Sequence, residues 1–462
     1  MLGFEPTQDQ QNLFLSLSNF TLSDPENDWL CVVTGYAGTG KTSALSAYVQ
    51  LLENINYKYV LLAPTGRAAK VFSNFTYLPT STIHKHIYRQ KSIDKAVATF
   101  ELDFNKAKKT IYIVDEVSLI TTATSSESAF GSGDVLDDLI KFVRNSPSNK
   151  LILVGDPAQL PPIGLDKSPA LDIDYLSKYS DKIEYLSLRE VVRQEDGSGI
   201  LMNATALRKQ IENNDLSSPR FELKKYKDIC SISGGELIEE LSDSISQYGL
   251  DEVVVLCRSN ARANKYNQGI RTRVLDYDEQ LQKGDKVMIV KNCYNFDGDQ
   301  TLDFIANGDV ATLRSIKKYE ERYGLHFASA TLEFEDYGGA EVRAKIILDT
   351  LESNTASLGK EEQNALFEGL VKDYSFMKKR KKKEIYKDIR EDPYFNALQI
   401  KYSIAITGHK SQGGQWKCVF IDNIMWKDEI TIEDKKWLYT ALTRGVEKVY
   451  LVNFPSKYLD YE

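Results

Sequence analysis

The chain has 462 residues, of which 42% are hydrophobic and 27% are charged, a balance typical of folded soluble proteins. This composition argues against wholly disordered, collagen-like and coiled-coil chains, and the length suffices for about three domains. The 58 Lys and Arg residues against 66 Asp and Glu leave a net charge of −8. A polyanionic ligand would therefore have to be held by local basic patches and not by the field of the whole molecule.

The cysteines and the N-terminus bear on the compartment. The five cysteines lie far apart and form no CxxC pair, which favours neither a zinc site nor a disulfide framework. No apolar run approaches the roughly 18 residues of a membrane-spanning helix, and the first residues show no signal-peptide pattern. We therefore expect a cytoplasmic protein that does not contact a membrane.

The first half of the chain alternates short apolar runs with longer mixed segments. The runs predict buried strands at 29–33, 59–63, 110–114, 151–154 and 183–188. Two of the segments between them, 43–52 and 135–143, are typical of helices. This alternation predicts an open α/β sheet with parallel strands.

A second set of strands and helices follows later in the chain. Strands are predicted at 252–256, 403–406, 419–421 and 449–452, with helices at 260–274 and 433–442. A segment with a different sequence pattern interrupts this set between 281 and 394. It has short β-like runs at 286–290, 310–313 and 330–334, followed by a charged, helix-rich stretch. We interpret it as an inserted subdomain, and the shorter segment 86–109 as a small excursion from the first sheet.

The strongest motif in the chain is a glycine-rich loop between a predicted strand and a predicted helix, GYAGTGKT at 35–42. Glycines at Gly35, Gly38 and Gly40 allow the backbone N–H groups to approach phosphate oxygens, and the helix N-terminus adds favourable charge. The sequence therefore predicts an ATP site in which Thr39 lies in the loop, Lys41 neutralises the β- and γ-phosphates and Thr42 binds Mg²⁺.

Two carboxylates follow the predicted strand at 110–114. Asp115 would hold Mg²⁺ and Glu116 would polarise the attacking water, because ligands of such sheets gather at the carboxyl ends of the strands. No spare cluster of His and Cys suggests a metal other than magnesium. Hydrolysis also needs cations that reach the γ-phosphate, and Arg193 and Arg444, each just beyond an apolar run, are the candidates.

Together these motifs and six more resemble, in order, those of superfamily 1 helicases, and most closely the 5′-to-3′ group (1B) that contains bacteriophage Dda and RecD. The resembling stretches are EPTQDQQNLF (Q motif), GYAGTGKT (I), 63–70 (Ia), 81–84 (Ib), VDEVSLI (II), 154–162 (III), 406–413 (V) and 438–445 (VI). The resemblance runs nearly from end to end. It implies a host cytoplasmic location if a phage encodes the chain.

The resemblance also implies roles for individual residues. Gln10 would read the adenine, Gln159 would sense the γ-phosphate, and Arg193 and Arg444 would act as arginine fingers. A path for single-stranded DNA would be lined by Pro64, Thr65, Thr82, His84, Thr407, His409 and Lys410. Taken singly, His84 and His409 would each more often be a structural histidine than a DNA contact; the ordering of the motifs favours the DNA-binding interpretation.

The fold that the resemblance implies has two RecA-like parallel-sheet motor domains. Domain 1A would comprise 1–85 and 110–190, with a hairpin insertion 1B at 86–109. Domain 2A would comprise 191–280 and 395–462, with insertion 2B at 281–394 formed by an SH3-like barrel and a helical extension. Insertion 1B would carry the pin that separates strands, and Phe100 is the candidate. Packing of Phe100 in a small local core is an equal alternative.

The function implied is ATP-dependent translocation from 5′ to 3′ on single-stranded DNA, with unwinding of fork DNA in replication, recombination or repair. The expected partners are single-stranded and fork DNA, with single-strand-binding or replication proteins as further candidates, and the expected state is a monomer. Alternatives are a DNA-stimulated ATPase or translocase of opposite polarity without strand separation, a phosphate-loop ATPase or kinase without a DNA track, and an inactive clamp or loader. The basic run 378–383 fits a solvated helix face or a phosphate contact.

Overall fold

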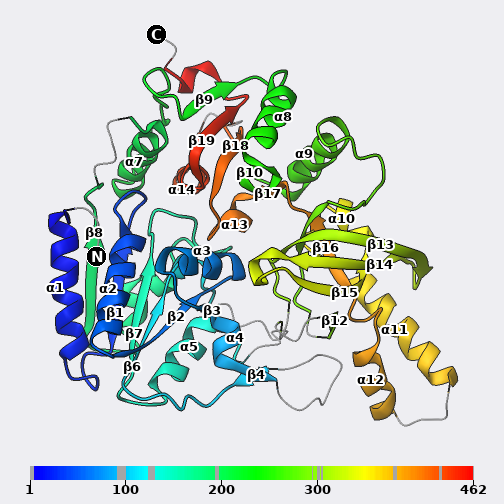
Figure 1. The fold of residues 1–462 in the computed structure, drawn as a ribbon, viewed down its shortest axis with the longest axis horizontal. Coiled ribbons are helices and arrows are strands. Elements are labelled where there is room, and N and C mark those ends of the chain that lie inside the picture. Colours follow the sequence, from blue (N-terminus) through cyan, green and yellow to red (C-terminus); the bar gives the residue numbers. More distant parts are fainter. Residues whose placement is uncertain are drawn as a thin grey trace.

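The computed structural model describes residues 5–90, 100–122, 131–192, 197–293, 295–298, 302, 305–377, 382–425 and 429–460. Two parallel sheets and one largely antiparallel sheet organise this part of the chain, and a two-stranded pair, β4 (Tyr88–Gln90) and β5 (Phe100–Leu102), projects from the first sheet's domain (Figure 1). None of the described helices is long and apolar enough to cross a membrane.

The first sheet has the strand order β3-β2-β6-β7-β1-β8, and all its pairings are parallel. Its strands are β1 (Leu30–Gly35), β2 (Lys58–Ala63), β3 (Thr80–Thr82), β6 (Thr110–Val114), β7 (Lys150–Gly155) and β8 (Ile183–Leu188). Its helices are α1 (Gln8–Leu22), α2 (Lys41–Asn54), α3 (Gly66–Thr76), α4 (Ile83–Ile87), α5 (Val135–Arg144) and α6 (Ile173–Leu176). Strands β1, β6 and β7 are buried along their whole length, which explains their near-continuous apolar sequences.

The second sheet, in the order β17-β10-β18-β19-β9, is also parallel throughout. Its strands are β9 (Ile229–Ile232), β10 (Val253–Cys257), β17 (Ala405–Thr407), β18 (Trp416–Asp422) and β19 (Gly445–Val452). Its helices are α7 (Gly199–Glu212), α8 (Leu237–Tyr248), α9 (Asn260–Arg273), α13 (Gly408–Ser411) and α14 (Ile432–Leu442). The two parallel sheets confirm the predicted pair of RecA-like domains. The strands predicted from apolar runs are found in them, with shifted ends except for β6 and β8.

The third sheet belongs to the insertion and has the order β12-β15-β14-β13-β11-β16. Its strands are β11 (Lys286–Ile289), β12 (Asp297–Gly298), β13 (Val310–Arg322), β14 (Leu325–Phe334), β15 (Ala340–Ile347) and β16 (Leu398–Tyr402). Helices α10 (Asp349–Glu352), α11 (Lys360–Met377) and α12 (Lys382–Glu391) follow β15, and α11 and α12 form the predicted helical extension (Figure 1). Because β16 pairs with β11 and β15, the second parallel sheet resumes only at β17.

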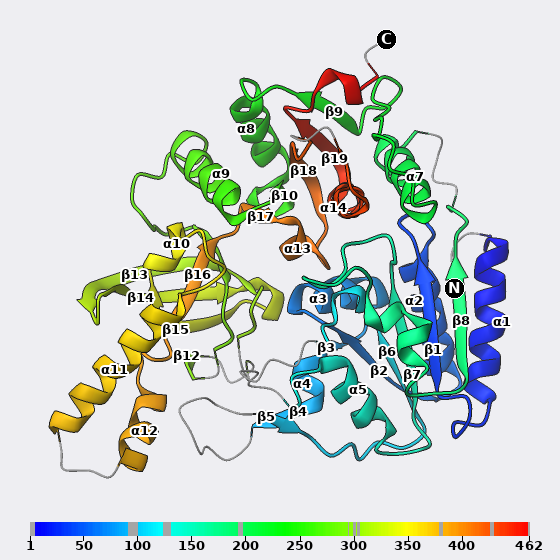
Figure 2. The same ribbon diagram turned by 180° about the vertical axis from the view of Figure 1, so that it is seen from behind.

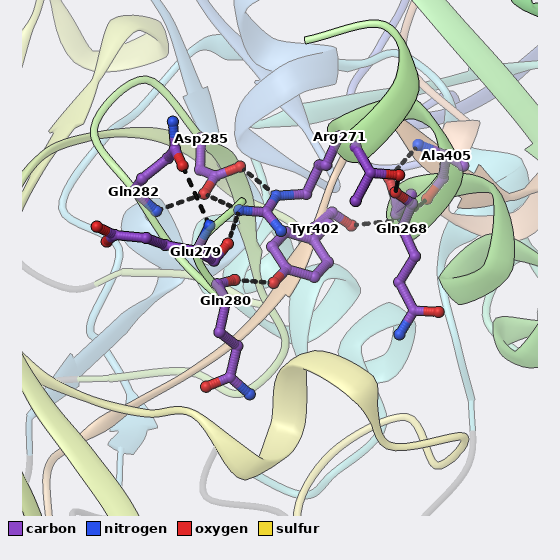
Figure 3. A network of polar contacts seen from close by, with 10 residues as sticks. Gln268, Arg271, Glu279, Gln280, Gln282, Asp285, Tyr402 and Ala405 are labelled. Atoms are coloured by element: carbon purple, nitrogen blue, oxygen red, sulfur yellow. Dashed lines mark hydrogen bonds and ion pairs between the residues drawn. The ribbon is translucent and has the colours of Figure 1, made fainter. Parts of the chain in front are cut away.

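A buried ion pair joins the insertion to the second parallel sheet (Figure 3). Arg271 on α9 donates from Nε to Asp285 Oδ1 at 2.7 Å and from Nη2 to the Glu279 carbonyl at 2.7 Å, and the Arg271 and Asp285 side chains are 5% and 1% exposed. The guanidinium also lies 4.6 Å from the ring centroid of Tyr402, whose hydroxyl donates to the Gln280 carbonyl. Breaking such a buried bidentate pair costs several kcal/mol, roughly 3–5, so we expect the insertion to move with the second domain.

Candidate nucleotide site and nucleic-acid path

The phosphate loop runs from the end of β1 to the start of α2, as predicted. Gly38 and Gly40 have φ values of +75° and +69°, a region that favours glycine. A methyl group at Gly38 would lie 2.4 Å from Leu201 Cδ1, and one at Gly40 would lie 2.5 Å from Gln10 Nε2. The positive φ values therefore favour glycine at both positions, and a larger residue would also displace the ends of the Leu201 and Gln10 side chains.

Gln10 is hydrogen-bonded to this loop. Its side chain is fully buried, Nε2 donates to the Thr39 carbonyl at 3.1 Å, and Oε1 accepts from the Thr7 backbone N–H in the capping box that begins α1. Thr39 is itself buried, and its hydroxyl donates to the Tyr36 carbonyl at 2.8 Å. The first helix of the chain is thus fastened to the loop that would hold the phosphates.

The carboxyl ends of β1, β6 and β7 meet at this loop. Lys41 Nζ lies 3.9 Å from Asp115 Oδ1, and both side chains are nearly buried. Burial disfavours the charged form of Lys41, but Asp115, Glu116 and Asp156 outweigh it and raise the pKa of Lys41. Burial also raises the pKa of Asp115, which the charge of Lys41 opposes. The lysine therefore stays charged where a triphosphate would need a cation.

Two buried oxygens at the same edge have no hydrogen-bond partner among the described residues, Glu116 Oε2 and Gln159 Oε1. Such orphaned acceptors are costly unless a ligand or water meets them, so they fit a site for nucleotide and attacking water. Thr42 and Asp115 supply the hydroxyl and carboxylate oxygens that Mg²⁺ prefers beside phosphates. Within the described ranges, no cluster of three His, Cys, Asp or Glu residues forms another metal site.

Arg444 reaches this site from the second parallel sheet. It follows α14, is 4% exposed, and donates from Nε to the Thr440 carbonyl at 3.2 Å and from Nη1 to the Gly414 carbonyl at 3.1 Å. A cavity of about 600 Å³ is lined by residues of both sheets' domains, among them Lys41, Thr42, Glu116, Gln159 and Arg444. The structure therefore brings two of the three cations predicted for the γ-phosphate, Lys41 and Arg444, into one cavity. Arg193 lies outside the described residues.

The residues predicted for the DNA path on the first domain cluster at two helix starts. Pro64 precedes Thr65, whose hydroxyl caps α3 by accepting from the Ala68 N–H, and Thr82 caps α4 by accepting from the Lys85 N–H. Burial lowers the pKa of His84 to about 4, so this imidazole is neutral at pH 7. His84 can therefore contact a strand only as a neutral group.

The predicted DNA residues of the second domain lie at the start of α13. Thr407 is the N-cap residue of α13, and burial, with Arg258 as a second cause, lowers the pKa of His409. Burial, and then the charge of Lys401, lowers the pKa of Lys410 to about 8. Lys410 is thus the titratable cation of this set that changes charge just above neutral pH.

The two predicted halves of the DNA path touch each other. In both views α13 lies beside α3 (Figures 1 and 2), and a methyl group at Gly413 would lie 2.8 Å from Ala68 Cβ. The Arg67 guanidinium stacks 3.9 Å from the ring centroid of Trp416, and Lys70 Nζ lies 2.7 Å from Asp336 Oδ1 of the insertion. Helix α3 is therefore the meeting point of all three sheets.

Phe100 is the first residue of β5, paired with Gln90, and it packs against the hydrophobic core of the first sheet. Its packing against this core favours the local-core alternative; residues 91–99, between β4 and β5 in the chain, lie outside the described residues.

Three residues that join elements of the candidate site were not singled out from the sequence: Tyr439, Asp156 and Arg67. The first two lie inside stretches that resemble motifs VI and III, and the third lies inside motif Ia, so the ordered motifs were the signal that could have found them. The Tyr439 hydroxyl contacts Asp156 and the phosphate loop from the other domain.

Several known proteins are similar to parts of this chain. The uncharacterized protein MJ1519 of Methanocaldococcus jannaschii is 24% identical over 91% of this chain and 36% of its own length. The ATP-dependent RecD2 DNA helicase of Deinococcus radiodurans is 31% identical over 29% of this chain and 16% of its own length. This chain therefore spans only about a third or less of these two relatives. A solved Bacteroides Pif1 helicase in complex with ADP-AlF3 and ssDNA is 17% identical, with a TM-score of 0.49 over 99% of this chain and 95% of that one.

Two families match at positions that correspond to the two sheets. Residues 23–219 match the AAA domain family, and residues 402–452 match the UvrD-like helicase C-terminal domain. The first match includes the phosphate loop, Asp115 and Gln159, and the second includes Thr407, Lys410 and Arg444. The chain therefore matches an AAA domain over its first parallel sheet and a UvrD-like helicase C-terminal domain over part of its second, in line with the order of the eight motifs.

Proposed function

We propose that this protein hydrolyses ATP to translocate from 5′ to 3′ along single-stranded DNA and to unwind duplex DNA ahead of it. The observation that carries the proposal is the shared cavity between the two parallel-sheet domains, lined by Lys41 from one side and Arg444 from the other. A nucleotide in this cavity would be contacted by both domains, so its binding and hydrolysis would change how the domains sit against each other. The processes served would be replication, recombination or repair.

The chain's own residues supply the parts of a phosphoryl transfer to water. The loop N–H groups and Lys41 would hold the β- and γ-phosphates, and Gln159 would contact the γ-phosphate. Glu116 would orient a water and take up its proton as the water oxygen bonds to the γ-phosphorus and the bond to the β-bridging oxygen breaks. Arg444 would stabilise the charge that develops. Mg²⁺, held by Thr42 and Asp115, would neutralise phosphate charge when bound.

Strand contact would come from α3, α4 and α13. These helices present Thr65, Thr82 and Lys410 at the junction of the domains, and contacts of this kind to the DNA backbone carry no sequence information. Because these contacts would be made to the DNA backbone, we expect the protein to bind single strands of any sequence. We assign strand separation to the β4–β5 pair, with Phe100 fastening it to the core of the first sheet.

The polarity is tested with two partial duplexes that differ only in the tail. We expect single-stranded DNA to stimulate ATP hydrolysis and the protein to unwind the substrate with a 5′ tail but not the one with a 3′ tail. Unwinding of only the 3′-tailed substrate would reverse the proposed polarity. Stimulated hydrolysis with neither substrate unwound would support the alternative of a translocase that does not separate strands, and hydrolysis indifferent to DNA would leave an ATPase without a DNA track.

The charge of Lys410 should make the affinity for single-stranded DNA depend on pH. Because burial lowers its pKa to about 8, it is mostly charged at pH 7 and mostly neutral at pH 9. If it contacts a DNA phosphate, the affinity for an oligonucleotide such as oligo(dT) falls as the pH rises through about 8. Lys410→Arg stays charged across this range and should remove most of that fall. An identical pH profile in the parent and the variant, measured by fluorescence anisotropy, would exclude Lys410 from the DNA path.

A further inference from the structure

The hydroxyl group of Tyr439 lies at a buried three-way junction between the two parallel-sheet domains. Tyr439 is on α14, is 1% exposed, and its hydroxyl donates to Asp156 Oδ2 at 2.6 Å while accepting from the Ala37 N–H at 2.8 Å. Asp156 follows β7 and Ala37 is in the phosphate loop, so one side-chain atom of the second domain is bonded to two elements that build the nucleotide site of the first.

Two further hydrogen bonds join the same two domains. The Leu160 N–H donates to Thr440 Oγ1 at 3.0 Å, and Gln412 Nε2 donates to the Leu160 carbonyl at 2.7 Å. Thr440, like Tyr439, is fully buried on α14. Several hydrogen bonds thus join α14 to the segment after β7 at a buried contact, which we call the dock.

The dock controls where Arg444 lies. Arg444 follows α14 directly, and its guanidinium is held by the carbonyl of Thr440 at the end of the same helix. Tyr439 and Arg444 are five positions apart, so a shift of α14 relative to the phosphate loop moves the guanidinium relative to Lys41. Asp156 is charge-coupled to Lys41, which connects the same hydroxyl to the other cation of the cavity.

We infer that Tyr439 is a positioning residue for ATP hydrolysis: its hydroxyl fixes α14 on the phosphate loop and thereby sets the distance of Arg444 from the γ-phosphate. This inference rests on the proposed function and adds a residue to it. Tyr439 does not line the nucleotide cavity, so its effect on the reaction passes through Arg444.

The test replaces Tyr439 by phenylalanine, which keeps the ring and removes both hydrogen bonds. We expect kcat of the DNA-stimulated ATPase to fall about 10- to 100-fold, the size of effect that a misplacement of about 1 Å produces. The KM for ATP should change by less than about threefold, because the phosphate loop that binds the ground state is intact.

The matched control is Tyr458→Phe. Tyr458 packs in the same hydrophobic cluster as Tyr439, is 2% exposed, and its hydroxyl has no hydrogen-bond partner among the described residues. Its loss should leave kcat and KM unchanged. Thr440→Val is a second variant of the dock, which removes the acceptor of the Leu160 N–H and should lower kcat in the same direction by a smaller factor. It keeps the inference testable if Tyr439→Phe does not fold.

A double-mutant cycle distinguishes positioning from a general loss of structure. If Tyr439 acts through Arg444, Tyr439→Phe should cause little further loss of kcat in an Arg444→Ala background, with Lys41→Ala setting the experimental floor. Effects that multiply would overturn the inference, as would normal kcat in both Tyr439→Phe and Thr440→Val. A wild-type protein without DNA-stimulated hydrolysis would instead contradict the proposed function, so the two failures are distinguishable.

Discussion

Replacing Lys41 with alanine should reduce ATP hydrolysis by at least about 1,000-fold and abolish unwinding. This lysine is the cation of the phosphate loop, its charge is maintained by three carboxylates, and phosphoryl transfer depends on positioned cations for factors of about 10³–10⁵ in rate. The measurement is release of inorganic phosphate with saturating single-stranded DNA, together with unwinding of a 5′-tailed duplex.

The control for this variant is Lys58→Ala. Lys58 begins β2 of the same sheet, is exposed, and is distant in sequence from the loop, so its loss should leave both activities unchanged. If Lys41→Ala unwinds DNA at a rate near that of the parent, the proposed ATP-driven motor function is wrong.

Arg444→Ala should lower kcat by about 10³-fold or more while the KM for ATP changes little, because an arginine finger acts on charge that develops only in the transition state. Arg444 is buried and donates to the carbonyls of Thr440 and Gly414, so the variant also removes a hydrogen bond from each of them, although the Thr440 carbonyl still accepts from Thr443 Oγ1. Thermal unfolding must therefore accompany the kinetics, to separate a loss of stability from a loss of catalysis.

Arg444→Lys refines this prediction. Lysine keeps the charge but cannot reproduce the planar fork of the guanidinium, so we expect partial recovery relative to alanine. If Arg444→Ala raises the KM for ATP and leaves kcat unchanged, Arg444 contributes only to ground-state binding of ATP. Its assignment as an arginine finger would then be wrong.

The sequence was informative where a pattern is local. The buried strands of both parallel sheets show as short apolar runs, and β6 and β8 have the predicted bounds. Helix α3 gave no such signal, because it begins with Gly66 after Pro64 and Thr65, a composition that is also typical of loops. The capping hydroxyl of Thr65 is what begins this helix.

Features that depend on long-range packing could not be predicted. Strand β16 falls within 395–462, the segment that was assigned to domain 2A, and only its pairing with β11 and β15 places it in the sheet of the insertion. Tyr439 and Ala37 are 402 positions apart, and nothing in either local sequence indicates that one hydroxyl joins them. Phe100 shows the same limit: its neighbours allow either a pin or a core residue, and the tertiary packing favours the core.

The central claim is that one nucleotide is contacted from both domains. It is tested most directly by a crystal structure of the protein with single-stranded DNA, Mg²⁺, ADP and aluminium fluoride. The claim predicts Lys41 Nζ and an Arg444 guanidinium nitrogen both within about 3.2 Å of the fluoroaluminate group. An Arg444 that remains on the carbonyls of Thr440 and Gly414, with the fluoroaluminate contacted by the first domain alone, would contradict it.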